Sequence, residues 1–337
     1  MADVQNWQKG RPAKYDMETF DEVLVQHTKR FMDKAKQDGK PFFIWHNTTR
    51  MHIFTYIPPK YQAMMNYGSN YGVEEAGMAQ LDDCVGELLQ HLQDIGEADN
   101  TIVVFTTDNG AEVFTWPDGG MTPFKGAKGT SFEGGFRVPA IIRWPGHVKP
   151  GSVENGIFSG LDWFPTLAAA AGNPDITNQL LKGVKLGDRT YKNHLDGYNQ
   201  CAMLEGRGPS ARHELFYFSG PQLGAIRIDD FKFQFLQQPW GWPGEKTATD
   251  MPTIINIRQD PFERTSSLRG ESLNDSAGGY LNDFMGREFW RFVLVQREVA
   301  KLAQTAIEYP PMQSPASFNL QAVKEKIQEA IKVHAGE

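Results

Sequence analysis

The stretch TIVVFTTDNG, residues 101–110, decides how this chain is organised. It begins as a β-branched and aromatic run typical of a buried strand and ends abruptly in Asp108, Asn109 and Gly110. Asn-Gly is a common hairpin turn and an aspartate before it can cap that turn, so a plain turn is one interpretation. The other interpretation is that a buried strand delivers two oxygen ligands to a hard cation at its carboxyl end.

The segments around this stretch alternate between helical and strand-like patterns. Apolar residues recur at helical spacing over residues 16–40, where Gly39 occupies the position of a helix stop, and again over residues 73–96. PFFIWHNTTRMH, residues 41–52, has the pattern of a buried strand, and VPAIIRWPG, residues 138–146, has the pattern of a third. This order predicts an α/β layered fold with a mostly parallel sheet, in which ligands gather beyond the carboxyl ends of the strands.

After about residue 180 the pattern changes to short strands separated by turns, which is typical of an antiparallel sheet. The runs HELFYFSG, LGAIRID, FKFQFLQQ and IINIRQDPFE follow one another, and two helices are expected near residues 279–307 and 318–334. We therefore expect two domains, an α/β part over residues 1–180 and a smaller α+β part over residues 181–337.

Composition excludes several classes of protein. The net charge is -7, and acidic and basic residues are interspersed without a basic block. The charge distribution therefore gives no indication of nucleic-acid binding. The apolar runs are far shorter than a membrane span, and the N-terminal residues contain no apolar signal-peptide core. Cys84 and Cys201 are the only cysteines, too few for a disulfide scaffold or a zinc cluster, and both are expected to be packed thiols.

Five motifs in a fixed order carry a family resemblance. TTDNG, KGAKGTSFEGGFRVPAIIRWPG, DWFPTLAAAAG, HLDGYN and NIRQDPFE resemble, in the same order, the arylsulfatase-type sulfatases of the alkaline phosphatase superfamily. The resemblance covers nearly the whole chain from about residue 18. It implies the later half of an alkaline-phosphatase-like α/β/α sandwich with a mostly parallel sheet, followed by a small antiparallel C-terminal subdomain. It also implies a sulfuric ester hydrolase.

The resemblance assigns the residues of a site. Asp108 and Asn109 match the pair that helps the family hold Ca²⁺ or another divalent cation, and their oxygens suit a hard ion. Lys128 matches the lysine that contacts the sulfate and the bridging oxygen, although Lys125 is close enough to compete for that assignment. His52 matches the histidine that protonates the departing alcohol or phenol, a task that suits an imidazole.

Other residues are assigned from their positions. Arg50 and Trp116 are placed at the substrate mouth by location alone. Glu133 is expected to be a buried hydrogen-bond or ion-pair partner rather than an acid catalyst, and Asp162 is expected to be a helix N-cap. The run QPWGWPG, residues 238–244, suits either stacking on an aryl or sugar ring or a hairpin tip with structural tryptophans.

The nucleophile of the family is missing from this chain. The family oxidises a Cys or Ser in a C/S-x-P-x-R motif to formylglycine, and no P-x-R occurs in this sequence. The family's early Asp-Asp metal pair and its G-K-W-H segment are also absent, because Asp82-Asp83 fits a helix and Asp229-Asp230 fits a turn. We therefore expect the chain to lack an N-terminal half and to be inactive as a sulfatase in isolation.

Three alternatives stay open at this point. The first is a phosphoesterase or phosphonate hydrolase of the same superfamily. The second is a non-catalytic chain that binds sulfated ligands through Lys128 and His52, and the third is one subunit of a split enzyme. The expected ligand is a sulfated small molecule or glycan, and the export of many family members suggests the periplasm or the outside of the cell.

Overall fold

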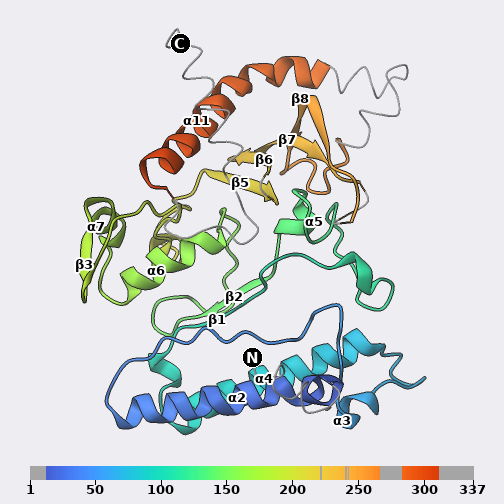
Figure 1. The fold of residues 1–337 in the computed structure, drawn as a ribbon, viewed down its shortest axis with the longest axis vertical. Helices are drawn as coiled ribbons and strands as arrows, with labels where there is room; N and C mark the ends of the chain where they lie inside the picture. The colour runs from blue at the N-terminus through green and yellow to red at the C-terminus, as the bar shows by residue number, and fades with distance from the viewer. Residues whose placement is uncertain (1–12, 221, 240, 242, 266–282, 311–337) are drawn as a thin grey trace. The chain divides into compact units, whose positions relative to one another are not determined.

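The computed structural model describes residues 13–220, 222–239, 241, 243–265 and 283–310 (Figure 1). By their internal contacts the residues group into two compact units. The first consists of Met1–Val104, Ala111–Met121 and Ile142–Pro145, and the second of Phe105–Gly110, Thr122–Ile141 and Gly146–Glu337. The domain boundary expected near residue 180 stays a prediction. Within the described residues no helix is long and apolar enough to cross a membrane.

Two helices form the body of the first unit (Figure 1). Helix α2, Ala13–Gln37, packs along α4, Val73–Asp94, and the short α3, Pro59–Gln62, contacts α4 as well. Both long helices confirm the sequence patterns, and Gly39 follows α2 in the left-handed region at φ 61°. The buried apolar side chains of α2 and α4 are Val25, Met32, Ala35, Ala76, Leu81, Cys84 and Leu92.

Residues 41–52 do not form the strand that their sequence predicts, which corrects that expectation. Burial alternates along the segment: Phe42 and Ile44 are half-buried, whereas Phe43 and Trp45 are 70% and 80% exposed. This is the alternation of a strand. A strand also needs a backbone partner, and in the described part of the chain no strand pairs with this segment.

The strand before the DNG turn is confirmed. Strand β1, Val103–Thr106, pairs with β2, Ala140–Arg143, in a two-stranded sheet, and each strand contributes residues to both units. The remaining short elements are η1 Ala98–Asn100, η2 Val113–Thr115, α5 Glu133–Phe136, η3 Gly160–Asp162, α6 Trp163–Ala170, α7 Ile176–Lys182, α8 Cys201–Leu204 and the hairpin of β3, Val184–Leu186, with β4, Arg189–Tyr191. The sequence analysis missed α7 and this hairpin.

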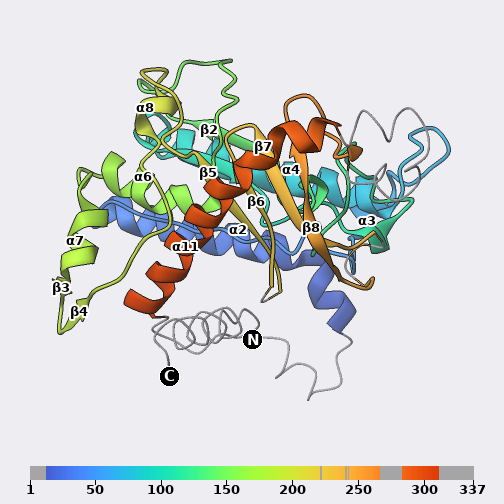
Figure 2. The same ribbon diagram turned by 90° about the horizontal axis from the view of Figure 1, so that it is seen from above.

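A four-stranded antiparallel sheet dominates the second unit and confirms three of the strands expected there; the fourth, expected at residues 254–263, instead begins at residue 247 and ends at residue 256. Its strands follow the chain order: β5 Glu214–Ser219, β6 Gln222–Ile228, β7 Phe231–Gln237 and β8 Thr247–Asn256. Helix α11, Phe292–Glu308, preceded by η4, Phe289–Arg291, covers one face (Figures 1 and 2). The second closing helix, expected at residues 318–334, lies outside the described residues.

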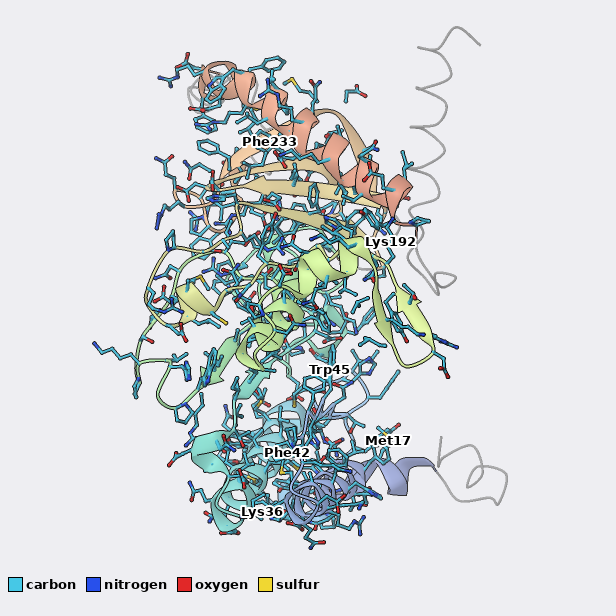
Figure 3. The ribbon with its side chains drawn as sticks, turned by 90° about the vertical axis from the view of Figure 1, so that its left-hand side faces the viewer. Met17, Lys36, Phe42, Trp45, Lys192 and Phe233 are labelled. Atoms are coloured by element: carbon cyan, nitrogen blue, oxygen red, sulfur yellow. The ribbon has the colours of Figure 1, made fainter. Side chains whose placement is uncertain are left out.

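The two faces of this sheet differ in chemistry, although both are buried along β7. Phe231, Phe233 and Phe235 pack in the core under α11, where Phe233 is 1% exposed (Figure 3). Lys232 and Gln234 alternate with them and are completely buried on the opposite face. The second unit therefore has an apolar layer beneath α11 and a polar layer on the other side of the sheet.

Candidate active site

The turn after β1 presents two oxygen-bearing side chains. Asp108 is exposed and Asn109 is half-buried, and neither side chain makes a hydrogen bond within the described residues. The turn itself is held by Thr107, whose hydroxyl donates to the Asn109 carbonyl at 2.9 Å. A carboxylate and an amide thus stand at a strand end, and no described residue uses their oxygens as hydrogen-bond acceptors.

Gly110 joins this turn to a second one. Its N–H donates to the Gly135 carbonyl at 3.0 Å, and a Cβ at this position would lie 1.8 Å from the Gly134 oxygen. Any side chain at residue 110 would therefore push the two turns apart. The DNG sequence is more than a hairpin turn, because it packs against the EGG sequence about 25 residues later in the chain.

The glycine-rich loop, residues 122–137, folds back on itself around Lys128. Gly126 and Gly129 on either side of the half-buried lysine have φ of 79° and 81°, a conformation that other residues rarely adopt. The loop is closed by the Gly134 N–H, which donates to the Lys125 carbonyl at 2.7 Å. Lys128 therefore stands in a segment whose backbone is fixed on both sides.

Lys125, the competing lysine, has a packing role. Its amine lies 4.8 Å from the centroid of the Phe132 ring. Burial lowers its pKa below the ordinary value, although Glu263 and Asp260 oppose that shift. The assignment of Lys128 as the lysine of the site stays a prediction.

Glu133 is a buried ion-pair partner, as the sequence analysis expected. Its carboxylate accepts from the Lys232 amine at 3.1 Å and from the Tyr217 hydroxyl at 2.9 Å. Burial works to raise the pKa of Glu133, but the charge of Lys232 and these two hydrogen bonds hold it below its ordinary value. Sequence reasoning missed Lys232 and Tyr217, because no motif marks them.

Asp162 stands at the N-cap position of α6, but its side chain makes no cap hydrogen bond, which corrects the expected role. The carboxylate instead forms a fully buried ion pair with Arg212, at 2.6 Å. It also accepts from the backbone N–H groups of Ser159 at 2.9 Å and Tyr198 at 2.8 Å. Asp162 therefore ties three segments of the second unit together.

Three of the expected site residues belong to the first unit. His52 is exposed in the bend after residue 50, and its carbonyl accepts from the Thr55 hydroxyl at 2.7 Å. Trp116 follows η2 and is 63% exposed, so its ring is open to contact. Neither side chain makes a hydrogen bond within the described residues, and both keep their expected roles as predictions.

The assignment of Arg50 to the substrate mouth is wrong for this structure. The residue is 4% exposed, and its guanidinium donates to Gln80 Oε1 at 2.8 Å and to the Met17 carbonyl at 3.0 Å. Its backbone N–H donates to the Asp21 carboxylate at 3.1 Å. Arg50 joins α2 to α4, and its donors are already used there.

The oxygen atoms of Asp108 and Asn109 are suitable ligands for a hard cation, but they are too few to complete its coordination. Ca²⁺ takes six to eight oxygen ligands, and these two side chains supply only some of them. Within the described ranges no group of three or more His, Cys, Asp or Glu side chains is arranged to hold a metal ion. Further ligands must come from elsewhere if a cation binds here.

Comparison with known proteins places the chain in a family. The family model described as Sulfatase matches residues 1–173, which is more than half of the chain. The chain belongs to the sulfatase family. Arylsulfatase A of Bos taurus is 31% identical over 282 residues, which cover 78% of this sulfatase chain and 49% of the bovine protein. N-acetylgalactosamine-6-sulfatase of Homo sapiens is 30% identical over 265 residues, covering 72% and 47%.

A solved structure shows the same fold. The PsFucS1 sulfatase from Pseudoalteromonas sp. superposes with a TM-score of 0.70 at 27% identity, covering 88% of this chain and 55% of that protein. The sulfatase chain thus has the alkaline-phosphatase-like architecture of mixed helices and sheets, with a small antiparallel C-terminal sheet. It spans about half the length of the relatives it matches.

Proposed function

We propose that this chain carries the metal-binding and leaving-group side of a sulfatase active site, and that the complete protein hydrolyses a sulfate monoester. The observation that carries the proposal is the packing of the two turns. Gly110 holds the Asp108–Asn109 pair directly against the loop that presents Lys128. In a chain of the sulfatase family, this arrangement brings two cation ligands and one ammonium group into the same unit.

Asp108 and Asn109 would hold a divalent cation, with Ca²⁺ favoured by the oxygen donors. Such an ion, when bound, neutralises charge on the sulfate oxygens and orients the ester. The backbone that carries these two side chains is held in place, because Thr107 and Gly110 anchor the turn by hydrogen bonds.

Lys128 supplies a positive charge to the sulfate and to the bridging oxygen, where negative charge develops as the S–O bond breaks. The resemblance assigns His52, in the first unit, the task of giving a proton to the departing alcohol or phenol. Trp116 offers an exposed aromatic face to the organic part of the substrate. No residue of this chain is assigned as the nucleophile, so the covalent step belongs to polypeptide outside the sequence described here.

The organic part of the substrate is proposed as an aryl group or a sugar. This follows the names of the relatives, an arylsulfatase and an N-acetylgalactosamine-6-sulfatase. It agrees with the exposed ring of Trp116, because aromatic rings stack on both kinds of group.

The decisive experiment uses the native polypeptide that carries this sequence in its source cell. Its intact mass is measured first, and its turnover of 4-nitrophenyl sulfate is then compared with that of 4-nitrophenyl phosphate. We expect a mass above 37.9 kDa and faster turnover of the sulfate ester. Faster turnover of the phosphate would replace the proposal by a phosphoesterase, and binding of sulfated glycans without turnover would replace it by a binding protein.

Two variants test the assigned roles in that polypeptide. Lys128→Ala should lower kcat by about 10²–10³, the usual effect of removing one preorganised charge donor. His52→Ala should lower kcat for an alkyl or sugar sulfate by about 10²–10⁴, and much less for 4-nitrophenyl sulfate, whose leaving group needs little protonation. Equal losses on both substrates would remove the general-acid role. The chain of 337 residues alone should show no turnover, and turnover that disappears in its Lys128→Ala variant would contradict that expectation.

A further inference from the structure

A buried charge cluster joins the antiparallel sheet of the second unit to the glycine-rich loop. Lys232 of β7 lies between two carboxylates, with its amine 3.1 Å from Glu133 and 2.8 Å from Glu263. The three side chains are 4% exposed or less. The Lys232 amine also lies 4.1 Å from the centroid of the Tyr217 ring, so an aromatic face borders it as well as the two carboxylates.

The cluster binds the backbone of the loop as well as one of the loop's side chains. Glu263 accepts the Glu133 backbone N–H with its second oxygen at 2.6 Å, at the first residue of α5. Glu263 itself has φ 54°, a left-handed conformation that costs a non-glycine residue free energy. One oxygen of the Glu263 carboxylate thus fixes the start of the EGG turn, and its other oxygen binds Lys232.

The same face of the sheet holds the loop at two points close to Lys128. The Ser219 hydroxyl donates to the Gly129 carbonyl at 2.8 Å, and the Gln234 amide donates to the Ser131 hydroxyl at 2.7 Å. Gly224 allows this approach, because a Cβ there would lie 2.5 Å from the Ser131 hydroxyl. The loop is therefore attached to the sheet at residues 129, 131 and 133, immediately after the lysine of the site.

A buried ion cluster is a poor source of stability when compared with apolar side chains of similar size, but in some proteins it specifies one arrangement of its partners. We propose that Lys232 is a positioning residue: with Glu133 and Glu263 it fixes the loop that presents Lys128. Through the Gly110–Gly135 hydrogen bond, it also fixes the Asp108–Asn109 turn. The functional importance of this positioning rests on the proposed role of Lys128. The positioning of the loop itself can be measured without an activity assay.

The test is amide hydrogen exchange of the purified chain, followed by mass spectrometry of peptides that cover residues 105–112, residues 122–137 and strands β6–β8. Lys232→Met removes the charge and leaves the volume filled, and Glu133→Gln removes the opposite charge at nearly constant shape. In both variants we expect exchange in residues 122–137 and 105–112 to rise at least tenfold more than exchange in the strands. If Lys232→Met does not fold, Tyr217→Phe decides, because it removes only the hydrogen bond to Glu133.

Arg212→Met is the matched control. It also breaks a buried ion pair of the second unit, with Asp162, but no hydrogen bond of that pair reaches the glycine-rich loop within the described residues. We expect this control to raise exchange in the loop and the strands in equal proportion. The same proportional rise in the Lys232 and Glu133 variants would overturn the proposal, because the cluster would then only support the core.

The two proposals fail in different ways. Local loosening in Lys232→Met, together with normal turnover of the native polypeptide carrying Lys128→Ala, would remove the catalytic role of Lys128 and keep the positioning role of Lys232. If exchange in Lys232→Met instead rises equally in the loop and the strands, and Lys128→Ala abolishes turnover, the positioning role of Lys232 is removed. The catalytic role of Lys128 is then kept.

Discussion

Replacing Arg212 by methionine should destabilise the second unit strongly, because it isolates a buried carboxylate. The Arg212–Asp162 pair is 2% and 0% exposed, and the guanidinium approaches both carboxylate oxygens. It also donates to the Glu214 carbonyl at 3.1 Å and the Asp196 carbonyl at 2.7 Å. One substitution therefore removes the counter-charge of Asp162 and two hydrogen bonds to backbone.

The magnitude follows from what remains around Asp162. Breaking one side of a buried ion pair costs about 3–5 kcal/mol. Three donors would still face the carboxylate, namely the N–H groups of Ser159 and Tyr198 and the side-chain amide of Gln200. We therefore expect a loss near the lower end, about 3 kcal/mol, in the free energy of unfolding.

Urea denaturation followed by tryptophan fluorescence measures this loss, since Trp163 is adjacent to Asp162 in the chain. Adding Asp162→Asn to Arg212→Met should recover part of the loss, because the orphan charge is then gone. Arg207→Met is the matched control: its pair with Glu205 is exposed on the arginine side, at 65%, and should cost less than about 1 kcal/mol. Equal losses for the two arginine variants would refute the reasoning, as would a double variant no more stable than Arg212→Met.

Three further predictions concern single sites. Gly110→Ala should lower the free energy of unfolding by about 1–3 kcal/mol, because its Cβ would lie 1.8 Å from the Gly134 oxygen. Gly86→Ala, in an exposed and open position of α4, should raise it by about 0.5–1 kcal/mol, so a loss in both variants would contradict the steric argument. Burial raises the pKa of Cys84 from 9.0 to about 12, which lowers its thiolate fraction at pH 8 by about 10³. A thiol-reactive disulfide should therefore label the half-buried Cys201 well before Cys84, and comparable rates would count against the burial of Cys84. The pKa of His213 should lie above its ordinary value, because the Asp229 carboxylate 2.7 Å away stabilises the charged ring. Since that pKa is higher in the folded state, the stability this pair contributes is present below the unfolded pKa and is lost as the pH rises through the folded pKa. An NMR titration in which Asp229→Asn leaves the His213 midpoint unchanged would contradict this.

Local chemistry was enough to predict much of the architecture. Helices α2 and α4 follow from apolar residues at helical spacing and from Gly39, and β1 follows from the β-branched run before Asp108. Strands β5, β6 and β7 were visible as short apolar runs between turns, whereas the run taken for the fourth strand overlaps only the last three residues of β8. These helices and strands depend on residues that are close together in the chain, so they can be predicted from the local sequence.

The segment at residues 41–52 marks the limit of such reasoning. Its alternation of buried and exposed side chains is that of a strand, yet in the described structure it has no partner. Side-chain pattern belongs to the segment itself, whereas a backbone ladder requires a second segment. A pattern can therefore predict strand-like burial without predicting a strand.

The candidate site divides in the same way. The sequence by itself determined Asp108, Asn109 and Lys128 as candidates, because its motifs resemble those of the sulfatases in the same order. Only the tertiary structure decided that Arg50 is buried between helices and that Asp162 pairs with Arg212. Neither fact leaves a trace in the local pattern.

Lys232 shows the physical reason most clearly. In FKFQF a lysine between phenylalanines has the pattern of the solvent-facing side of a strand. In the structure that side is covered by Glu133 and Glu263, 99 and 31 positions away in the chain, and the lysine is fully buried. The sequence determined which side chains share a face, because that depends on a period of two residues. What covers the face depends on distant segments meeting in space, and only the tertiary structure decided it.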